Sequence, residues 1–298
     1  MRVGRISFWI AAIAMIAPVP PALAYMASGD RIFPATLVLP EMAPGDEFYV
    51  TYGMLPLIGG PGAPSRNSGI TATYAKTITD DLGIELDDTY TRLDRGRSSA
   101  FYGWQNFDGE LKYQALNNIA HEFQLDFGLD RETGGTGAFR VGASPSGATT
   151  PRVYFGKGLG DLDIGYLRPL AITGLTGVQI ADTAPRPDLV TTGLVVEYSL
   201  PYLESKVGSV DLPDWVRRLT PMTEFAFDAP AGRSYGMHPT GLVAPGVAYA
   251  GDGWELGIEA LVPTSRASGK GVGATVQFHL ALDYLFADSI GRPLFPGQ

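Results

Sequence analysis

The chain contains no cysteine. Without thiols it can form neither disulfide bonds nor thiolate metal sites. It also lacks the stretch of roughly 20 continuous apolar residues that a membrane-spanning helix requires, since the N-terminal apolar run covers only residues 8–17. Any insertion of the mature chain into a membrane must therefore be made by strands, whose backbone groups are satisfied by neighbouring strands.

The N-terminus has the pattern of a secretory signal peptide. Arg2 and Arg5 precede the apolar run, and proline-rich sequence then leads to Ala22 and Ala24, the small residues of a small-x-small cleavage site. An uncleaved anchor is the alternative, but the apolar run is too short and prolines follow it. We expect residues 1–24 to be a signal peptide that is removed during export.

Charged residues are also scarce and unbalanced, making up 18% of the chain. Removing Arg2 and Arg5 lowers the count of Lys and Arg from 22 to 20, against 31 Asp and Glu, so the mature net charge is 20 − 31 = −11. Such a chain should repel nucleic acid and attract cations. No nucleic-acid partner, cofactor or metal is expected.

What the chain does contain is strand-like alternation. In residues 271–286, Val276, Phe278 and Leu280 fall on one face, and Gln277 and His279 on the other. Sixteen residues exceed a typical soluble strand but suit a tilted strand that crosses a bilayer. A mean hydropathy of +0.06 is compatible with this, because only alternate residues of a barrel strand face lipid.

Similar segments recur along the chain between glycine- and proline-rich turns. The predicted strands cover residues 47–54, 69–78, 82–93, 107–116, 122–130, 151–156, 166–180, 189–200, 220–229, 240–250, 254–263 and 271–286. An even count of about twelve, with short connections alternating with long ones, is typical of single-chain bacterial outer-membrane barrels. The predicted fold is all-β: a transmembrane antiparallel β-barrel.

The rest of the chain completes the predicted organisation. Residues 25–45 should be an extended periplasmic N-terminal lead, which could also be tucked into the lumen, residues 46–286 the barrel, and residues 287–298 a periplasmic tail. Residues 202–219 interrupt the strand pattern. There Asp211 before Pro213, with arginines after them, predicts one short periplasmic helix.

A soluble periplasmic sandwich is the competing fold, since its strands also alternate. Its strands would be shorter and its outward faces richer in lysine. The barrel is therefore the favoured interpretation.

Several stretches support a family resemblance, and together they cover most of the mature chain. They read RIFPATLVL (31–39), GWQNFDGELKYQ (103–114), HEFQLDFGL (121–129), YFGKGLGDL (154–162), YLRPLAITG (166–174) and FHLALDYLFADSIGRPLF (278–295). In these stretches the chain resembles a family of uncharacterised exported proteobacterial barrels, similar in pattern to the phenol-degradation meta-pathway outer-membrane proteins. The resemblance implies an outer-membrane barrel and supplies no active site.

If the apolar faces meet lipid, the opposite faces line the lumen. The residues predicted to line the pore are Glu85, Asp87, Glu110, Lys112, Asp126, Asp130, Glu197, Glu224, Asp228, Glu255, Glu259, Gln277, His279 and Asp283. Because this set is mainly acidic, an open lumen would favour cations. Pairing of the same carboxylates with basic residues and tyrosines could instead plug a narrow barrel.

Three functions remain open from the sequence. The favoured one is an outer-membrane channel that passes small hydrophilic or aromatic solutes and prefers cations. The second is a closed barrel that anchors or partners envelope proteins, and the third is an outer-membrane hydrolase using His279, which would need a serine or acid beside it. The expected partners are outer-membrane lipid, small solutes and the barrel-assembly machinery, and the favoured function is not enzymatic.

Overall fold

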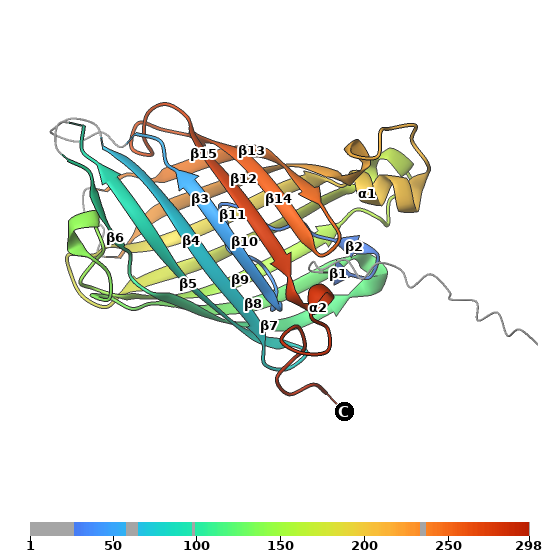
Figure 1. The fold of residues 1–298 in the computed structure, drawn as a ribbon, viewed down its shortest axis with the longest axis horizontal. Coiled ribbons are helices and arrows are strands. Elements are labelled where there is room, and N and C mark those ends of the chain that lie inside the picture. Colours follow the sequence, from blue (N-terminus) through green and yellow to red (C-terminus); the bar gives the residue numbers. More distant parts are fainter. Residues whose placement is uncertain (1–26, 58–64, 97–98, 233–236, 298) are drawn as a thin grey trace, which may run out of the picture.

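The computed structural model describes residues 27–57, 65–96, 99–232 and 237–297. The predicted signal peptide lies outside the described residues. Thirteen of the described strands form one antiparallel sheet that is wound into a barrel (Figure 1). Its strands are β3 (Glu47–Met54), β4 (Arg66–Thr77), β5 (Leu82–Asp94), β6 (Phe101–Trp104), β7 (Asp108–Asn118), β8 (Phe123–Glu132), β9 (Ala148–Gly158), β10 (Leu170–Ala181), β11 (Asp188–Tyr198), β12 (Leu219–Ala231), β13 (Thr240–Ala250), β14 (Trp254–Pro263) and β15 (Gly273–Ala281).

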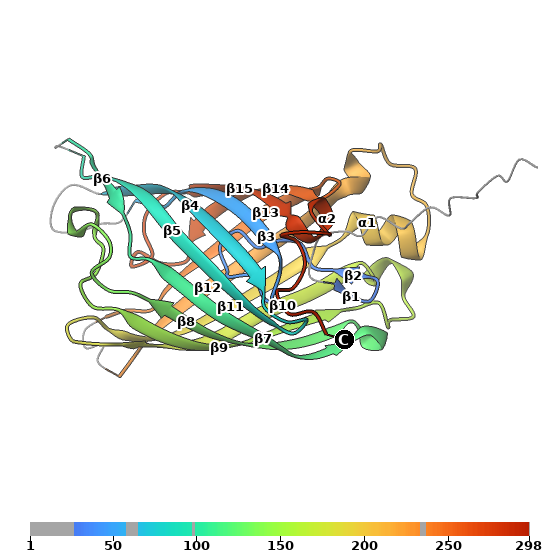
Figure 2. The same ribbon diagram turned by 60° about the horizontal axis from the view of Figure 1, so that its bottom comes forward.

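The sheet closes on itself into a barrel. β15 pairs with β3 and β4 pairs with β5, so the last strand of the sequence joins the first strand of the barrel. β6 and β7 both pair with β5 and together occupy one strand position of the barrel. The thirteen segments therefore form a barrel of twelve strands. The strands are tilted relative to the barrel axis, as closure of a sheet into a barrel requires (Figure 2). The predicted twelve-stranded barrel is confirmed.

The outer face of the wall is apolar. Residues on this face, such as Ile70, Leu129 and Ile258, are about half exposed, although they are large hydrophobic side chains. A contiguous apolar surface of this kind around a closed sheet is the surface that a transmembrane barrel presents to lipid. Aromatic side chains pack together near both ends, with ring centroids 5.2 Å apart for Tyr90 and Trp104 and 5.7 Å for Tyr249 and Trp254, as expected of interfacial girdles.

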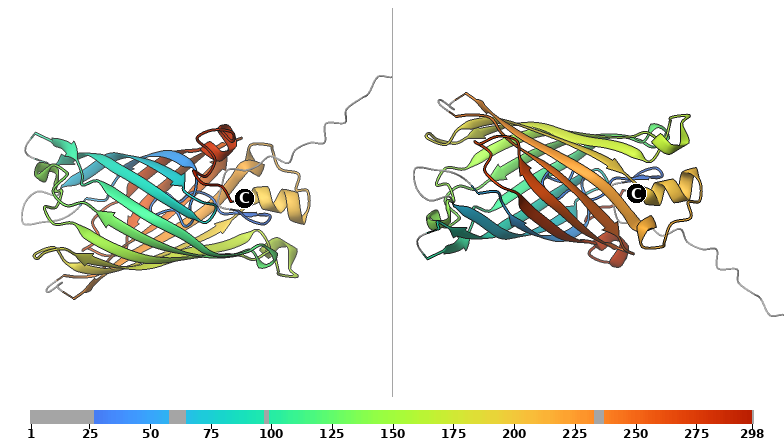
Figure 3. Two further views of the ribbon diagram at one scale, coloured as in Figure 1. Left: turned by 90° about the horizontal axis from the view of Figure 1, so that it is seen from below. Right: turned by 90° about the horizontal axis from the view of Figure 1, so that it is seen from above.

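The insert between β11 and β12 lies at the end of the barrel that also holds the C-terminal segment (Figure 3). It contains α1 (Leu200–Tyr202), the π-helical turn η4 (Leu203–Val207) and the 3₁₀ turn η5 (Val216–Arg218). Ser199 caps α1 by accepting a hydrogen bond from the Tyr202 amide. No helix of the described residues is long and apolar enough to cross a membrane.

Contacts of Glu204 stabilise the fold of the insert. Glu204 accepts a hydrogen bond from the Val210 amide and pairs with Arg217. These two donors hold the pKa of the Glu204 carboxyl below its usual value, the amide having the larger effect.

The structure corrects the predicted end of the last strand. β15 stops at Ala281, and α2 (Leu282–Leu285) follows it. Tyr284 and Asp283 therefore belong to a helical turn and not to the barrel wall. The alternation from residue 282 onward is real in the sequence, but there the chain turns towards Asp46, whose carbonyl accepts a hydrogen bond from the Leu282 amide.

Two further differences concern strand extent. β6 falls in residues that the sequence predicted to be a loop, and β9 is longer than the predicted residues 151–156. Both carry glycine or proline near their ends, which weakened the strand signal. The remaining predicted strands are confirmed to within about three residues at most ends, as is usual for boundaries read from a pattern.

The C-terminal segment folds back onto the barrel. The amides of Leu294 and Phe295 donate to the carbonyls of Thr77 and Ile78 at the end of β4. The Lys76 ammonium donates to the carbonyls of Ile290 and Arg292, at 3.1 and 2.6 Å, and also contacts Asp46. Lys76 of β4 thereby connects the barrel to the C-terminal segment.

Candidate functional site

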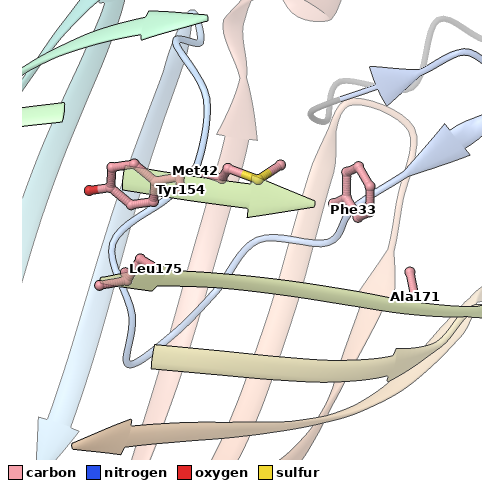
Figure 4. Packing of buried hydrophobic residues seen from close by; sticks show 5 residues of the cluster. All are labelled: Phe33, Met42, Tyr154, Ala171 and Leu175. Atoms are coloured by element: carbon pink, nitrogen blue, oxygen red, sulfur yellow. The ribbon is translucent and has the colours of Figure 1, made fainter. Parts of the chain in front are cut away.

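The N-terminal lead runs through the interior of the barrel. After the short hairpin of β1 (Ala27–Ser28) and β2 (Arg31–Ile32), residues 33–46 form no regular strand and lie inside the wall (Figures 1 and 4). Phe33 and Met42 pack against Tyr154 of β9 and Leu175 of β10, and Phe33 is 1% exposed. The sequence left open whether the lead is tucked into the lumen, and the structure places it there.

Glu224 of β12 holds the middle of the lead. Its carboxylate accepts hydrogen bonds from the backbone amides of three successive residues, Leu37 at 2.6 Å, Val38 at 3.3 Å and Leu39 at 2.8 Å. Three consecutive amides that converge on one anion form a concave donor site of the type that binds carboxylates and phosphates. Here the lead supplies the donors and the barrel wall supplies the anion.

Small residues next to Glu224 make room for a second carboxylate. Glu224 lies opposite Ala244 of β13, and Glu259 of β14 lies opposite Gly246 of the same strand. A Cβ atom at Gly246 would meet Glu259 Cγ at 2.4 Å, so glycine there lets the Glu259 side chain lie over the strand. Both oxygens of Glu259 are buried, and its carboxyl group interacts with that of Glu224.

Further polar contacts fix the lead on both sides of this point. Glu255 of β14 accepts a hydrogen bond from the Ala35 amide at 3.1 Å. Gln277 of β15 donates to the Thr36 carbonyl at 3.0 Å. Within the lead, Glu41 accepts from the Thr36 amide and folds the segment into a compact bend. The lead is therefore bound by side chains of β12, β14 and β15 and not by strand pairing.

A buried arginine fixes the start of the lead. Arg31 is 0% exposed and its guanidinium donates to Glu122 at 3.1 Å and to the carbonyls of Pro169 and Arg168. The same guanidinium lies 3.9 Å from the centre of the Tyr202 ring, and Tyr202 donates its hydroxyl to Glu122. Arg31 thus connects the lead to two turns of the barrel and to the insert.

A second set of charges lines the opposite wall. The Lys112 ammonium lies 2.7 Å from Glu85, and Glu110 accepts from Arg152 at 2.9 Å and from the Tyr154 hydroxyl at 2.7 Å. All five side chains are buried or nearly so. Here acids are matched by bases, in contrast to the region around Glu224.

The structure buries most of the predicted pore-lining side chains inside the barrel. These are Glu85, Glu110, Lys112, Asp126, Asp130, Glu197, Glu224, Glu255, Glu259, Gln277 and His279. Asp87 and Asp228 are half-buried, whereas Asp283 is exposed in α2 beyond the wall. Asp283 therefore does not lie on a barrel strand, and its assignment to the strand face was wrong.

His279 lies deep among these groups. Its Nε2 is 3.3 Å from Glu47 Oε2, and its ring meets the Tyr49 ring edge-on at 5.4 Å between centroids. Across the sheet it is opposite Tyr49 and Glu255. His279 therefore has an acid, Glu47, beside it. The histidine is only 2% exposed, and its contacts with Glu47 and Tyr49 do not supply a serine nucleophile.

Sequence reasoning missed the residues that organise the interior. Arg31 and Glu41 lie in a lead without any periodic signal. Arg152 and Tyr154 lie inside the predicted strand 151–156 but were not assigned to the lumen. One available signal was the pattern of the lead itself. An arginine and a glutamate in an otherwise apolar, proline-rich exported segment need buried partners.

The lead leaves a cavity of about 540 Å³ on the side of the lumen away from the insert. We call it the outer vestibule. Its floor includes Leu37 and Val38 of the lead, and its wall includes threonines of β3, β4 and β5. The lead therefore separates the outer vestibule from the end of the barrel that holds the insert.

Comparison with known proteins supports the fold. The structure resembles an outer membrane channel from Pseudomonas putida F1, with 10% identity, a TM-score of 0.51, and 84% of this chain and 99% of that chain covered. It also matches the KdgM porin at 9% identity (TM-score 0.47, 78% of this chain and 98% of that chain) and the beta domain of the Bordetella autotransporter BrkA at 11% identity (TM-score 0.49, 80% and 99%).

No family model matches the chain, and no curated protein does. The resemblance to the phenol-degradation meta-pathway proteins therefore stays a prediction.

A closed twelve-stranded sheet, an apolar outer face and a polar interior are together the architecture of a protein that spans lipid by strands. The chain is a transmembrane β-barrel of the bacterial outer membrane.

Proposed function

We propose that the protein is an outer-membrane channel for small hydrophilic or aromatic solutes, that it prefers cations, and that the structure with the lead in the lumen is its closed state. The observation that carries the proposal is the polar interior of the closed wall. A barrel that served only as a solid support would gain stability from an apolar core, whereas this one buries at least eight carboxylate-bearing strand residues.

The contacts of the lead support reversible closure. Residues 33–46 add no strand to the sheet, so their removal would break side-chain contacts and leave the wall intact. Glu224 and Glu255 would then lose their amide donors and face water in the lumen. A lumen with these carboxylates exposed would attract cations, as rings of Asp and Glu do in cation pores.

The test is conductance in planar bilayers. The mature chain should give little current, and a chain that lacks residues 25–43 should give steady current with a reversal potential that favours cations in a salt gradient. A refolded double variant, Glu224→Ala with Glu255→Ala, releases the lead without a deletion and serves as the second route to the open state. Steady anion-selective current from both variants would contradict the cation preference.

A closed barrel that anchors or binds envelope proteins is the second candidate, because the lead fills the lumen of the structure. The same recordings separate the two. If both lead-released variants are folded and remain silent, the channel proposal fails and the anchor is favoured.

For biogenesis we propose that the barrel-assembly machinery inserts the chain. Phe286 and Phe295 are the aromatic residues nearest its end, and both are exposed, at 48% and 70%. Replacing each by alanine and comparing the yield of heat-modifiable barrel in outer membranes would show which of them contributes to assembly.

A further inference from the structure

The outer vestibule has a chemistry of its own. Among the described residues that line it there is no charged side chain, although the lumen below it is rich in carboxylates. Its polar lining consists of hydroxyl and amide groups, including Thr51, Thr71, Thr89 and Gln105. Its volume lies within the range of about 300–1,000 Å³ that is usual for small-molecule sites.

The hydroxyl groups form one continuous side of this cavity. Thr51, Thr71 and Thr89 are direct neighbours across β3, β4 and β5. The Thr71 and Thr89 hydroxyls are 2.8 Å apart, and Gln277 donates to the Thr51 hydroxyl at 3.1 Å. Each hydroxyl can both donate and accept, so the row retains capacity for further hydrogen bonds.

Glycine opens the space beside this row. Gly53 follows Thr51 on the inward face of β3, and a Cβ atom added there would meet nothing within 4 Å. The apolar side of the lining is the floor, where Leu37 and Val38 of the lead lie, together with Leu261 of β14. The cavity thus combines one hydrogen-bonding side with one apolar side.

We propose that the outer vestibule is a binding site for uncharged, polyhydroxylated solutes of monosaccharide to disaccharide size. Hydroxyl groups of such a solute replace water on the threonine row, and its C–H faces contact the aliphatic side. A charged analogue is disfavoured because no side chain of the described lining carries a compensating charge. This inference rests on the proposed channel function and names the solute class that reaches the lead.

The test is isothermal titration of the mature protein in detergent with glucose, galactose, maltose and myo-inositol. Gluconate and glucosamine are the charged comparisons. We expect at least one neutral solute to bind, and both charged analogues to bind at least about tenfold more weakly, because a charge would be desolvated without a partner. Failure of all four neutral solutes to bind, or equal binding of the charged ones, would overturn the proposal.

The decisive variant is Thr71→Val combined with Thr89→Val. These hydroxyls bond to each other, so replacing both leaves neither partner unsatisfied and should preserve the fold. The double variant should bind the neutral solute about tenfold more weakly. Thr176→Val, which removes an exposed hydroxyl from the lipid-facing side of β10, is the matched control and should bind normally. Unchanged binding by the double variant would contradict the site.

Conductance distinguishes this inference from the channel function. Current through the lead-released variants without binding of any neutral solute would contradict the solute site alone. Binding that depends on Thr71 and Thr89, together with silent lead-released variants, would support the site and contradict the channel.

Discussion

Arg31 and Glu122 form a buried ion pair, with 3.1 Å between the guanidinium Nε and the carboxylate Oε2. Arg31 belongs to the lead, and Glu122 precedes β8 with a left-handed backbone, φ 47°. Glu122 also accepts hydrogen bonds from the Gly160 amide and the Tyr202 hydroxyl. One carboxylate therefore joins the lead, the turn after β9 and the insert.

Arg31→Met should destabilise the protein strongly, because Glu122 would remain buried without its cation. Breaking one side of a buried pair typically costs about 3–5 kcal/mol. The free energy of unfolding in urea, followed by the loss of heat-modifiable mobility in detergent, measures this. Arg92→Met is the matched control, since its pair with Asp94 is exposed to solvent and such pairs contribute little to stability. Equal losses for both variants would contradict the role of Arg31.

Glu224→Ala should loosen the lead. Three backbone amides would lose their acceptor, and each unmade hydrogen bond of this kind costs about 1–3 kcal/mol when no water replaces it. Amide hydrogen exchange at Leu37, Val38 and Leu39, read by mass spectrometry, should accelerate at least about tenfold, the factor that corresponds to 1.4 kcal/mol. Asp228→Ala, on the same face of β12, is the control. Unchanged protection at the three amides would show that Glu224 does not hold the lead.

Gly246→Ala should impair folding. A Cβ atom there would lie 2.2 Å from the Ile258 carbonyl oxygen, which belongs to the paired backbone and cannot move aside cheaply. Overpacking of this kind costs about 1–3 kcal/mol. Gly53→Ala introduces the same methyl group where nothing lies within 4 Å, so it should fold like the parent chain. The yield of folded barrel after refolding compares the two, and equal yields would be the contrary result.

Lys76→Met should release the C-terminal segment. The ammonium bonds to the carbonyls of Ile290 and Arg292, and methionine of similar length cannot replace those bonds. Limited proteolysis should then cleave after residue 287 at a higher rate. The free energy of unfolding should also fall, because Asp46 loses the cation of its buried ion pair. Lys157→Met, which alters a partly exposed ion pair with Asp161, is the control. If the tail resists cleavage equally in both variants, other contacts such as those of Leu294 hold it.

The strand pattern predicted the barrel because alternation depends only on which residues face lipid, a local property of each strand. It could not show that α2 replaces the end of the last strand, since Leu282 and Tyr284 continue the same alternation in a helical turn. The inward-facing acidic residues could be predicted in the same way, because alternation assigns each strand residue to the outer or the inner face. Their partners could not be predicted, because Glu224 binds backbone amides 185 to 187 residues away, in a segment without any period.

The most direct test of a closed state held by the lead is an engineered disulfide bond that ties the lead to the barrel wall and can be reduced. A Cβ atom at Gly193 would lie 3.1 Å from Leu39 Cγ, so Leu39→Cys with Gly193→Cys should place two thiols within disulfide reach in a chain that has no other cysteine. Recorded in planar bilayers in the Glu224→Ala background, the oxidised protein should be silent, and reduction should switch on cation-selective current. Equal current before and after reduction of a verified disulfide would contradict closure by the lead.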